Sequence, residues 1–243
     1  MLLKMEGIDK SFDEKHPLLE GISFVVDAGD FVGIVGQNGA GKSTILKMLN
    51  GLLPFDKGEL LFDGRSYSDL TPRQKRVWSK EVCYIFQNAN LLGNQTVNYH
   101  LNLVYRLEGK RPDKAKIAEI CRFMGIEQLR KQRCQSLSGG QAQKVAIAMA
   151  LLGQAKVLLC DEISAALDAT SEAEIFELLQ RLNQKEGLTV IMISHNLSLI
   201  KKVCRRVLFL EDGHISKELK PAHQESALDA SDYYDFAERF LQA

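Results

Sequence analysis

The stretch DFVGIVGQNGAGKSTILKMLNGL, residues 30–52, decides the fold of this chain. It opens with the short apolar run Phe31–Val35, which is typical of a buried strand. Residues 36–43 follow as G-x-x-x-x-G-K-S, and apolar side chains then recur at helical spacing at Ile45, Met48, Leu49 and Leu52. Glycines let successive backbone N–H groups face inward, and the following helix adds the positive end of its dipole. The stretch therefore predicts a phosphate-binding loop, with the helix planted on a core.

Lys42 and Ser43 carry the chemistry of this loop. We expect Lys42 to reach the β- and γ-phosphates of a nucleotide as a point charge, and Ser43 to ligate the Mg²⁺ that bridges them. A chance match in a glycine-rich turn is the alternative, and the strand before the loop and the helix after it argue against that. The residues expected to contact the nucleotide are Gly36, Gln37, Asn38, Gly39, Ala40, Gly41, Lys42, Ser43 and Thr44.

Composition sets the limits within which the rest is interpreted. At 243 residues the chain can bury a full core, as one large domain or a domain with a sizeable insertion. Lysine plus arginine and aspartate plus glutamate number 31 each, so no basic field indicates nucleic acid or a lipid surface. No apolar run approaches the ~18 residues of a membrane span, and the first residues do not form a signal peptide. The five cysteines lack metal spacing and are interpreted as buried hydrophobes in a reducing compartment, so we expect a soluble, cytosolic chain.

Alternating strands and helices predict an α/β fold. Strands are expected at 2–8, 18–26, 31–35, 157–160 and 189–193, a short apolar run at 82–86, and a hairpin at 59–64 that turns at Asp63-Gly64; the first two strands are expected to form a small antiparallel layer. Helices are expected at 98–107, 113–124, 141–152, 172–184 and 197–204. Strands that alternate with helices imply a mostly parallel sheet covered on both faces.

The parts of the chain are distinguished by their residue patterns rather than by linkers. We expect a single domain over 1–243, with a nucleotide-binding core formed by 1–87 and 137–217. Residues 88–136 are predicted to be a helical insertion subdomain, in which Ile117, Ile120, Cys121 and Met124 share one helix face. The tail, 218–243, is more polar and is expected to end in one short amphipathic helix.

Two adjacent carboxylates follow the apolar run 157–160. Ligands bind at the carboxyl ends of strands in open α/β sheets, so Asp161 suits the Mg²⁺ shell. Glu162 is expected to point the other way along the pleat, free to orient an attacking water. An ordinary acidic exit from a strand is the alternative, which the upstream phosphate loop disfavours.

A second helix start is also suited to an anion. Residues 137–141, Leu-Ser-Gly-Gly-Gln, open a helix whose Val145, Ala148, Met149 and Leu152 are expected to face a core; the candidate contacts are Ser138, Gly139, Gly140 and Gln141. One nucleotide cannot readily use both helix starts from opposite sides. A neighbouring molecule is therefore expected to supply the second, unless this is a simple capped helix.

In order and spacing, 36–43, Gln87, 137–141, 161–162 and His195 resemble the ATPase subunit of ABC transporters, over residues 2 to about 217. The resemblance implies a P-loop NTPase fold, ATP and Mg²⁺, and two subunits that face head to tail and sandwich two ATP molecules. In such a pair each ATP is bound by the P-loop of one subunit and the 137–141 signature of the other.

The resemblance also implies further roles. Phe12 would stack on adenine, Gln87 would contact Mg²⁺ and water, and His195, placed after the last expected parallel strand, would contact the γ-phosphate. Residues 165–168 match the loop by which the two subunits touch. The alternatives are a core aromatic for Phe12, a strand-end amide for Gln87 and a capping or solvated histidine for His195.

The chain departs from the family pattern at four positions. Ile163 and Ala165 stand where proline and serine are usual, so a hydroxyl contact across the dimer is missing, and Lys144 and Met149 replace common arginines. None of these changes removes a group that hydrolysis needs.

The resemblance further implies partners and a location. They are a second ATPase subunit, in a homodimer, integral-membrane permease subunits and a solute-binding protein, at the cytoplasmic face of the membrane. The absence of a fused span and the segment 130–135 favour an importer, and other segments resemble amino acid or methionine importers. Two alternatives stay open: a cytosolic ABC ATPase outside transport, and a nucleotide-regulated binding module without turnover, which would lack Glu162.

Overall fold

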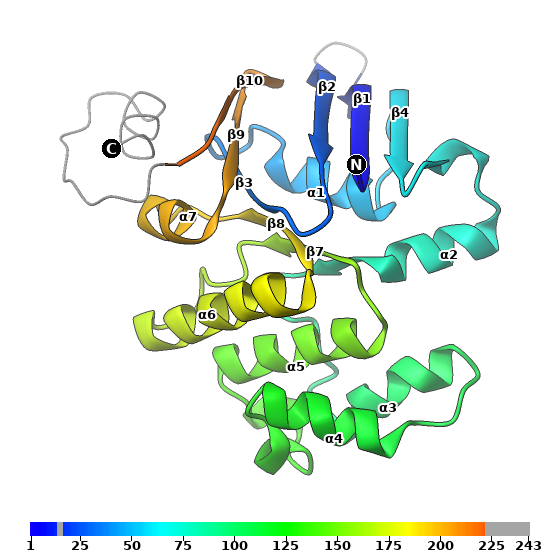
Figure 1. Cartoon of the computed structure of the whole chain (residues 1–243), viewed down its shortest axis with the longest axis vertical. Coiled ribbons are helices and arrows are strands. Elements are labelled where there is room, and N and C mark those ends of the chain that lie inside the picture. The colour runs from blue at the N-terminus through cyan, green and yellow to red at the C-terminus, as the bar shows by residue number, and fades with distance from the viewer. Residues whose placement is uncertain (14–16, 222–243) are drawn as a thin grey trace.

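Two β-sheets enclose a helix in the computed structural model, which describes residues 1–13 and 17–221 (Figure 1). The antiparallel sheet has the strand order β2-β1-β4-β5, and the larger sheet has the order β10-β9-β3-β8-β7-β6. The strands are β1 Leu3–Ser11, β2 Pro17–Val26, β3 Phe31–Val35, β4 Lys57–Phe62, β5 Arg65–Ser66, β6 Val82–Ile85, β7 Val157–Asp161, β8 Thr189–Ile193, β9 Arg206–Glu211 and β10 His214–Leu219. The α-helices are α1 Lys42–Asn50, α2 Pro72–Glu81, α3 Val97–Leu107, α4 Lys114–Phe123, α5 Gly139–Leu152, α6 Ala169–Glu186 and α7 Leu197–Val203.

The larger sheet is mostly parallel, as predicted. β3 runs parallel to both β8 and β9, β7 to β8 and β6 to β7, while β10 is the antiparallel edge strand. The predicted hairpin is also present, because β4 and β5 pair across Asp63 and Gly64, both of which have positive φ. One expectation was wrong: β8, which precedes His195, is not the last parallel strand, because β9 follows it beside β3.

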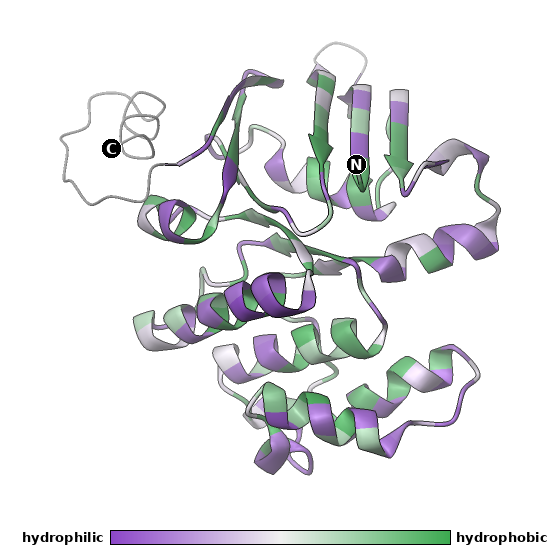
Figure 2. Cartoon of the chain, in the orientation of Figure 1, coloured by the Kyte–Doolittle hydropathy of each residue, from purple (hydrophilic) through white to green (hydrophobic). Residues whose placement is uncertain are grey.

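Each central strand contributes to two cores. Val157 and Leu159 of β7 pack with α1 and the antiparallel sheet, whereas Leu158 and Cys160 pack with the helices on the opposite face. Figure 2 shows the result, since the central strands are largely hydrophobic while α6 turns a hydrophilic face outward. Because side chains alternate across a strand, burial on both faces requires the nearly continuous apolar runs of the sequence. The sheet is thereby held rigidly between two layers.

The helical segment between β6 and α5 agrees with the predicted periodicity. Ile117, Ile120, Cys121 and Met124 are all buried, and α3 and α4 lie at the end of the molecule away from the antiparallel sheet (Figure 1). Among the described residues, no helix is long and apolar enough to cross a membrane.

Three details of the sequence-based prediction change. α2 was not expected; it begins at a capping box in which Thr71 accepts from Gln74 N, with proline at the first position. Leu52 is 55% exposed, because α1 ends at Asn50 and Gly51 turns the chain away at φ 84°. The helix expected at the end of the tail lies outside the described residues.

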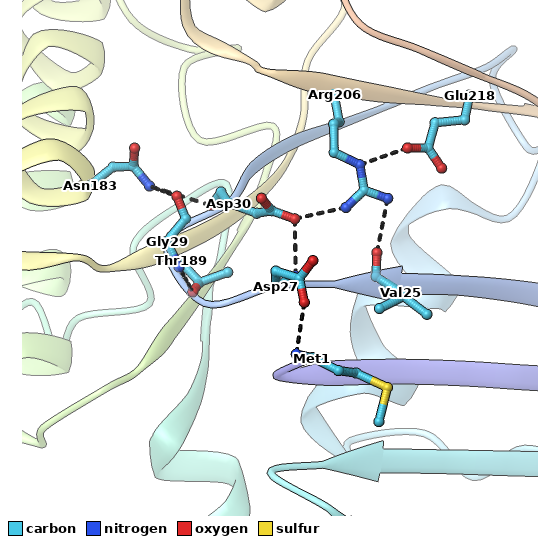
Figure 3. A network of polar contacts seen from close by, with 9 residues as sticks. All are labelled: Met1, Val25, Asp27, Gly29, Asp30, Asn183, Thr189, Arg206 and Glu218. Carbon is cyan, nitrogen blue, oxygen red and sulfur yellow. Dashed lines mark hydrogen bonds and ion pairs between the residues drawn. The ribbon is translucent and has the colours of Figure 1, made fainter.

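An arginine joins the two sheets at the end where β3 and β8 begin (Figure 3). The Arg206 guanidinium donates to Asp30 Oδ2 at 2.7 Å, to Glu218 Oε1 at 2.6 Å and to the Val25 carbonyl at 3.0 Å. Glu218 and Asp30 raise the pKa of Arg206, against its partial burial. Asp27, whose backbone N–H also donates to Asp30, pairs with the N-terminal ammonium at 2.8 Å. One side chain thus connects β2, β3, β9 and β10.

A buried amide completes this junction. Asn183 of α6 donates through Nδ2 to the carbonyls of Gly29 and Leu188, each at 2.8 Å, and the Gly29 N–H donates to Thr189 Oγ1 at 2.9 Å. These bonds satisfy loop groups that would otherwise be unpaired at the start of the sheet.

We expect Arg206→Met to lower the free energy of unfolding by about 2–3 kcal/mol, because it leaves two carboxylates and a carbonyl without their charged donor. Urea denaturation monitors the change. Lys57→Met is the control, since the side chain of Lys57 is 78% exposed and its ion pair with Asp9 should contribute less than about 1 kcal/mol. Equal losses in the two variants would show that the junction does not stabilise the fold.

Candidate functional site

The glycine-rich loop between β3 and α1 is a tight backbone cradle. A Cβ added at Gly36 would lie 2.4 Å from the Leu210 carbonyl oxygen of β9. At Gly41 it would lie 2.7 Å from Leu19 Cδ2, and the φ of 102° there favours glycine on its own. The loop therefore depends on glycine at both positions, and α1 begins immediately after it with its N–H groups directed into the loop.

Lys42 lies inside this cradle. Its side chain is buried, and Nζ donates to the carbonyl oxygens of Gly36 at 2.7 Å and Gln37 at 2.8 Å. Burial lowers the pKa of Lys42, while the nearby charges of Glu162 and Asp161 oppose that shift. A cation and inward backbone N–H groups together form a receptor for a phosphate group.

Ser43 and Asp161 are hydrogen-bonded to each other between α1 and the end of β7. Ser43 Oγ, in the first turn of α1, donates to Asp161 Oδ1 at 2.9 Å. The second carboxylate oxygen, Oδ2, accepts a hydrogen bond from the Tyr84 hydroxyl at the end of β6. Burial and this bond to Asp161 raise the pKa of Tyr84, so it stays a donor. Tyr84 was not anticipated, because only the order of β6 and β7 in the sheet brings it to Asp161.

Glu162 and His195 lie at the ends of neighbouring strands. His195 Nε2 lies 2.9 Å from Glu162 Oε1, and the Glu162 N–H donates to the Ile193 carbonyl of β8 at 3.2 Å. The sequence analysis expected the strand pleat to set the direction of Glu162, and this expectation was wrong. Its φ of 50° puts it in the left-handed region, so a backbone turn after β7 directs this side chain.

The second helix start forms a complete cap. Ser138 Oγ accepts from the Gln141 N–H at 3.3 Å, and the Ser138 N–H donates to Gln141 Oε1 at 3.0 Å. Ser138 and Gly139 are exposed, whereas Gly140 is buried. A Cβ added at Gly140 would lie 3.0 Å from Ser171 Cβ, which is a tight contact. The hydrogen bonds of Ser138 remain within α5, at a helix start that is exposed at Ser138 and Gly139.

Phe12 and Gln87 differ in their surroundings. Phe12 is 66% exposed, with the Lys10 ammonium 5.5 Å from its ring centroid, so it is not a core aromatic. Gln87 follows β6 and is exposed, and its backbone carbonyl accepts a 2.6 Å hydrogen bond from Gln143 of α5. Gln143 is a second residue that the motif analysis missed.

Two of the departures from the family pattern have structural partners. Ile163 is buried in the core of the helical face, and Lys144 pairs with Glu174 of α6 at 2.5 Å. Ala165 is exposed on the loop before α6. Lys144 therefore links α5 to α6, and Ile163 packs into the core that these two helices share.

Comparison with known proteins gives a consistent result. The family model described as ABC transporter matches residues 19–165. Methionine import ATP-binding protein MetN 1 of Staphylococcus aureus (strain MSSA476) is 36% identical over 219 residues, which are 88% of this chain and 64% of that protein. The chain thus spans 64% of the length of this relative.

Solved structures share the fold over nearly the whole chain. The ATP-binding cassette MJ0796, in a dimeric post-hydrolysis state bound to ADP and Pi, has a TM-score of 0.80 and 26% identity, covering 93% of this chain and 100% of that one. The protein cbiO1 of Clostridium perfringens, part of the ABC transporter complex cbiONQ, has a TM-score of 0.82 and 28% identity, covering 89% and 87%.

Proposed function

We propose that this chain, which belongs to the ABC transporter family, binds and hydrolyses ATP. The hydrolysis would drive the import of a small solute across a membrane. One observation carries the proposal: Lys42, Ser43, Asp161, Glu162 and His195 converge where β3, β7 and β8 end. A cation, a hydroxyl and a carboxylate suited to Mg²⁺, and a second carboxylate that can orient water are groups that promote phosphoryl transfer to water.

The phosphate-binding half of the mechanism follows from the loop. Lys42 and the N–H groups at the start of α1 bind the β- and γ-phosphates, and Phe12 offers an exposed ring for adenine. The remaining loop residues, Gln37, Asn38, Gly39, Ala40 and Thr44, contribute backbone contacts.

Ser43 and Asp161 have the donor chemistry for Mg²⁺, a hydroxyl and a carboxylate oxygen 2.9 Å apart, and Gln87 would add an amide oxygen. The described residues contain no group of three or more His, Cys, Asp or Glu side chains arranged for a metal, which suits an ion that completes its shell with phosphate oxygens and water. Mg²⁺ bound there would neutralise charge on the phosphates.

Hydrolysis is assigned to Glu162 and His195. Glu162 orients the attacking water, and its turn conformation together with the 2.9 Å contact to His195 fixes the direction of the carboxylate. His195 lies at the γ-phosphate side, where its imidazole holds Glu162 and faces the transferred group.

A second copy of the chain completes each site in this proposal. The start of α5 is capped, with Ser138 and Gly139 exposed, and its residues Ser138, Gly139, Gly140 and Gln141 would bind the ATP of a partner subunit. The MJ0796 cassette is dimeric in its structure bound to ADP and Pi, which supports the pairing of two subunits. Residues 165–168 would touch the partner, without a hydroxyl at Ala165.

We also propose a division of labour along the chain. Residues 1–87 and 137–217 form the nucleotide-binding core and 88–136 form a helical subdomain, within one domain over 1–243. Glu218 and Leu219 belong to β10, so the tail predicted from residue 218 begins after that strand. The helical subdomain follows β6 along the chain, so the loop at Gln87 joins it to the core.

A groove of about 640 Å³ beside Gln87 is the proposed docking site of an integral-membrane permease. It is lined by apolar side chains, including Phe86, Leu91, Val104 and Leu107, and by charged side chains, including Arg76 and Glu108. Leu91 packs partly into the core, and Leu92, the next residue, is 52% exposed. Docking there would place this subunit at the cytoplasmic face of the membrane.

The import function is proposed from the methionine relative, and it would involve a solute-binding protein as a further partner. A cytosolic ABC ATPase outside transport is the second candidate. A permease gene next to the gene for this chain would decide for transport, and an adjacent solute-binding lipoprotein gene would decide for import.

Leu107→Asp should uncouple transport while the isolated subunit keeps its ATPase activity, because Leu107 is 79% exposed and the new charge would enter the apolar groove. Solute uptake and ATPase activity are measured in parallel. Phe123→Asp on α4, outside this groove, is the matched control. Normal uptake by the Leu107 variant would place the permease elsewhere.

Glu162→Gln should lower turnover by roughly 10²–10⁴, the range for a positioned base, while ATP binding survives. ATP then persists between two subunits, so size-exclusion chromatography with ATP should show a shift toward the dimer. We expect this shift to be partial, because Ala165 lacks the hydroxyl that would contact the partner. Adding Ser138→Arg should abolish the shift by placing bulk and charge at the partner's phosphate. A Glu162 variant that stays monomeric and hydrolyses at the unmutated rate would refute both assignments.

A further inference from the structure

Gln143 makes an unusual pair of contacts with the loop that carries Gln87. It lies on α5, the helix that Ser138 caps, and its side chain is 1% exposed. Nε2 donates to the carbonyl oxygens of Phe86 at 3.0 Å and of Gln87 at 2.6 Å. One amide group thus holds two consecutive carbonyl oxygens, just where β6 has ended.

The orientation of this amide is determined by those two bonds. Oε1 of Gln143 is buried and, in the part of the chain that the structure describes, is the only such side-chain nitrogen or oxygen without a hydrogen-bond partner. Turning the amide over would set this oxygen against two carbonyl oxygens, which cannot donate. Gln143 therefore leaves its acceptor unpaired and keeps both bonds to the loop.

The loop that Gln143 holds is strained. The Phe86 carbonyl also accepts from the Ala89 N–H at 3.1 Å, and the next turn places Ala89 at φ 52° and Asn90 at φ 48°. Two successive residues with a Cβ in the left-handed region are unfavourable, and such conformations persist only where surrounding contacts impose them. The buried amide of Gln143 is one of those contacts.

We infer that Gln143 is a positioning residue, which ties the Gln87 loop to α5 so that both nucleotide-facing ends of one subunit move together. The inference rests on the proposed ATPase function. In that function Gln87 faces the ATP in its own P-loop, and Ser138 faces the ATP of the partner. Because α5 is a continuous helix, a displacement at Ser138 reaches the Phe86 and Gln87 carbonyls through the Gln143 amide.

Gln143→Met tests the tie, since it keeps the length and removes both donors. We expect kcat for ATP to fall at least about tenfold while KM changes less than about threefold, because the loop that positions the reacting groups is released and the P-loop is untouched. Gln180→Met on α6 is the matched control: its amide also donates to a backbone carbonyl, that of Lys202, far from the loop. It should leave both constants unchanged.

A double-mutant cycle separates positioning from a general structural effect. If Gln143 acts through Gln87, then Gln143→Met should lower kcat only slightly further in a protein that already carries Gln87→Ala. Fully multiplicative losses in the double variant would overturn the inference, as would an unchanged kcat in Gln143→Met. Gln143→Asn, which is too short to hold both carbonyls, serves the same test if the methionine variant does not fold.

Hydrogen exchange gives a readout that does not need turnover. Release of the loop should speed exchange at the Ala89 amide in nucleotide-free Gln143→Met, and unchanged protection there would refute the tie. Lack of ATPase activity in the unmutated protein would instead count against the proposed function, so the two failures are distinguishable.

Discussion

The contact between the Ser43 hydroxyl and the Asp161 carboxylate is the interaction on which the rest of the site depends. It joins the first turn of α1 to the last residue of β7, across 118 positions of sequence. Lys42 precedes Ser43, Glu162 follows Asp161, and Tyr84 holds the other carboxylate oxygen from the neighbouring strand. Each of these groups is therefore placed relative to this one contact.

The charges of the site come from two elements, with Lys42 at the start of α1 and the carboxylates at the end of β7. Burial disfavours the charge on Lys42, and the carboxylates of Asp161 and Glu162 compensate in part. A polyphosphate with a divalent cation would bring charges of both signs into this arrangement. Hydrophobic cores on both faces of the sheet hold α1 and β7 in place, so these charged groups stay close together.

Local patterns predicted much of this molecule. The loop at 36–43, the parallel strands and the helices at α3, α4 and α5 follow from glycine spacing and apolar periodicity, which are local properties. Tyr84 and Gln143 could not be found in this way, because their roles depend on which strands and helices become neighbours. The direction of Glu162 was also missed, since a left-handed turn after a strand leaves no periodic signal. Leu52 fitted the helical spacing but lies beyond the helix end at Gly51.

The central claim is that each catalytic site takes its phosphate loop from one subunit and its α5 start from another. Mixing two inactive variants, Lys42→Ala and Ser138→Arg, tests it most directly. In a mixed dimer one site carries both lesions, while the other joins an intact Lys42 loop to an intact Ser138. The account predicts that ATPase activity, absent from either variant alone, returns on mixing. A mixture that remains as inactive as its components, although mixed dimers form, would contradict the shared site.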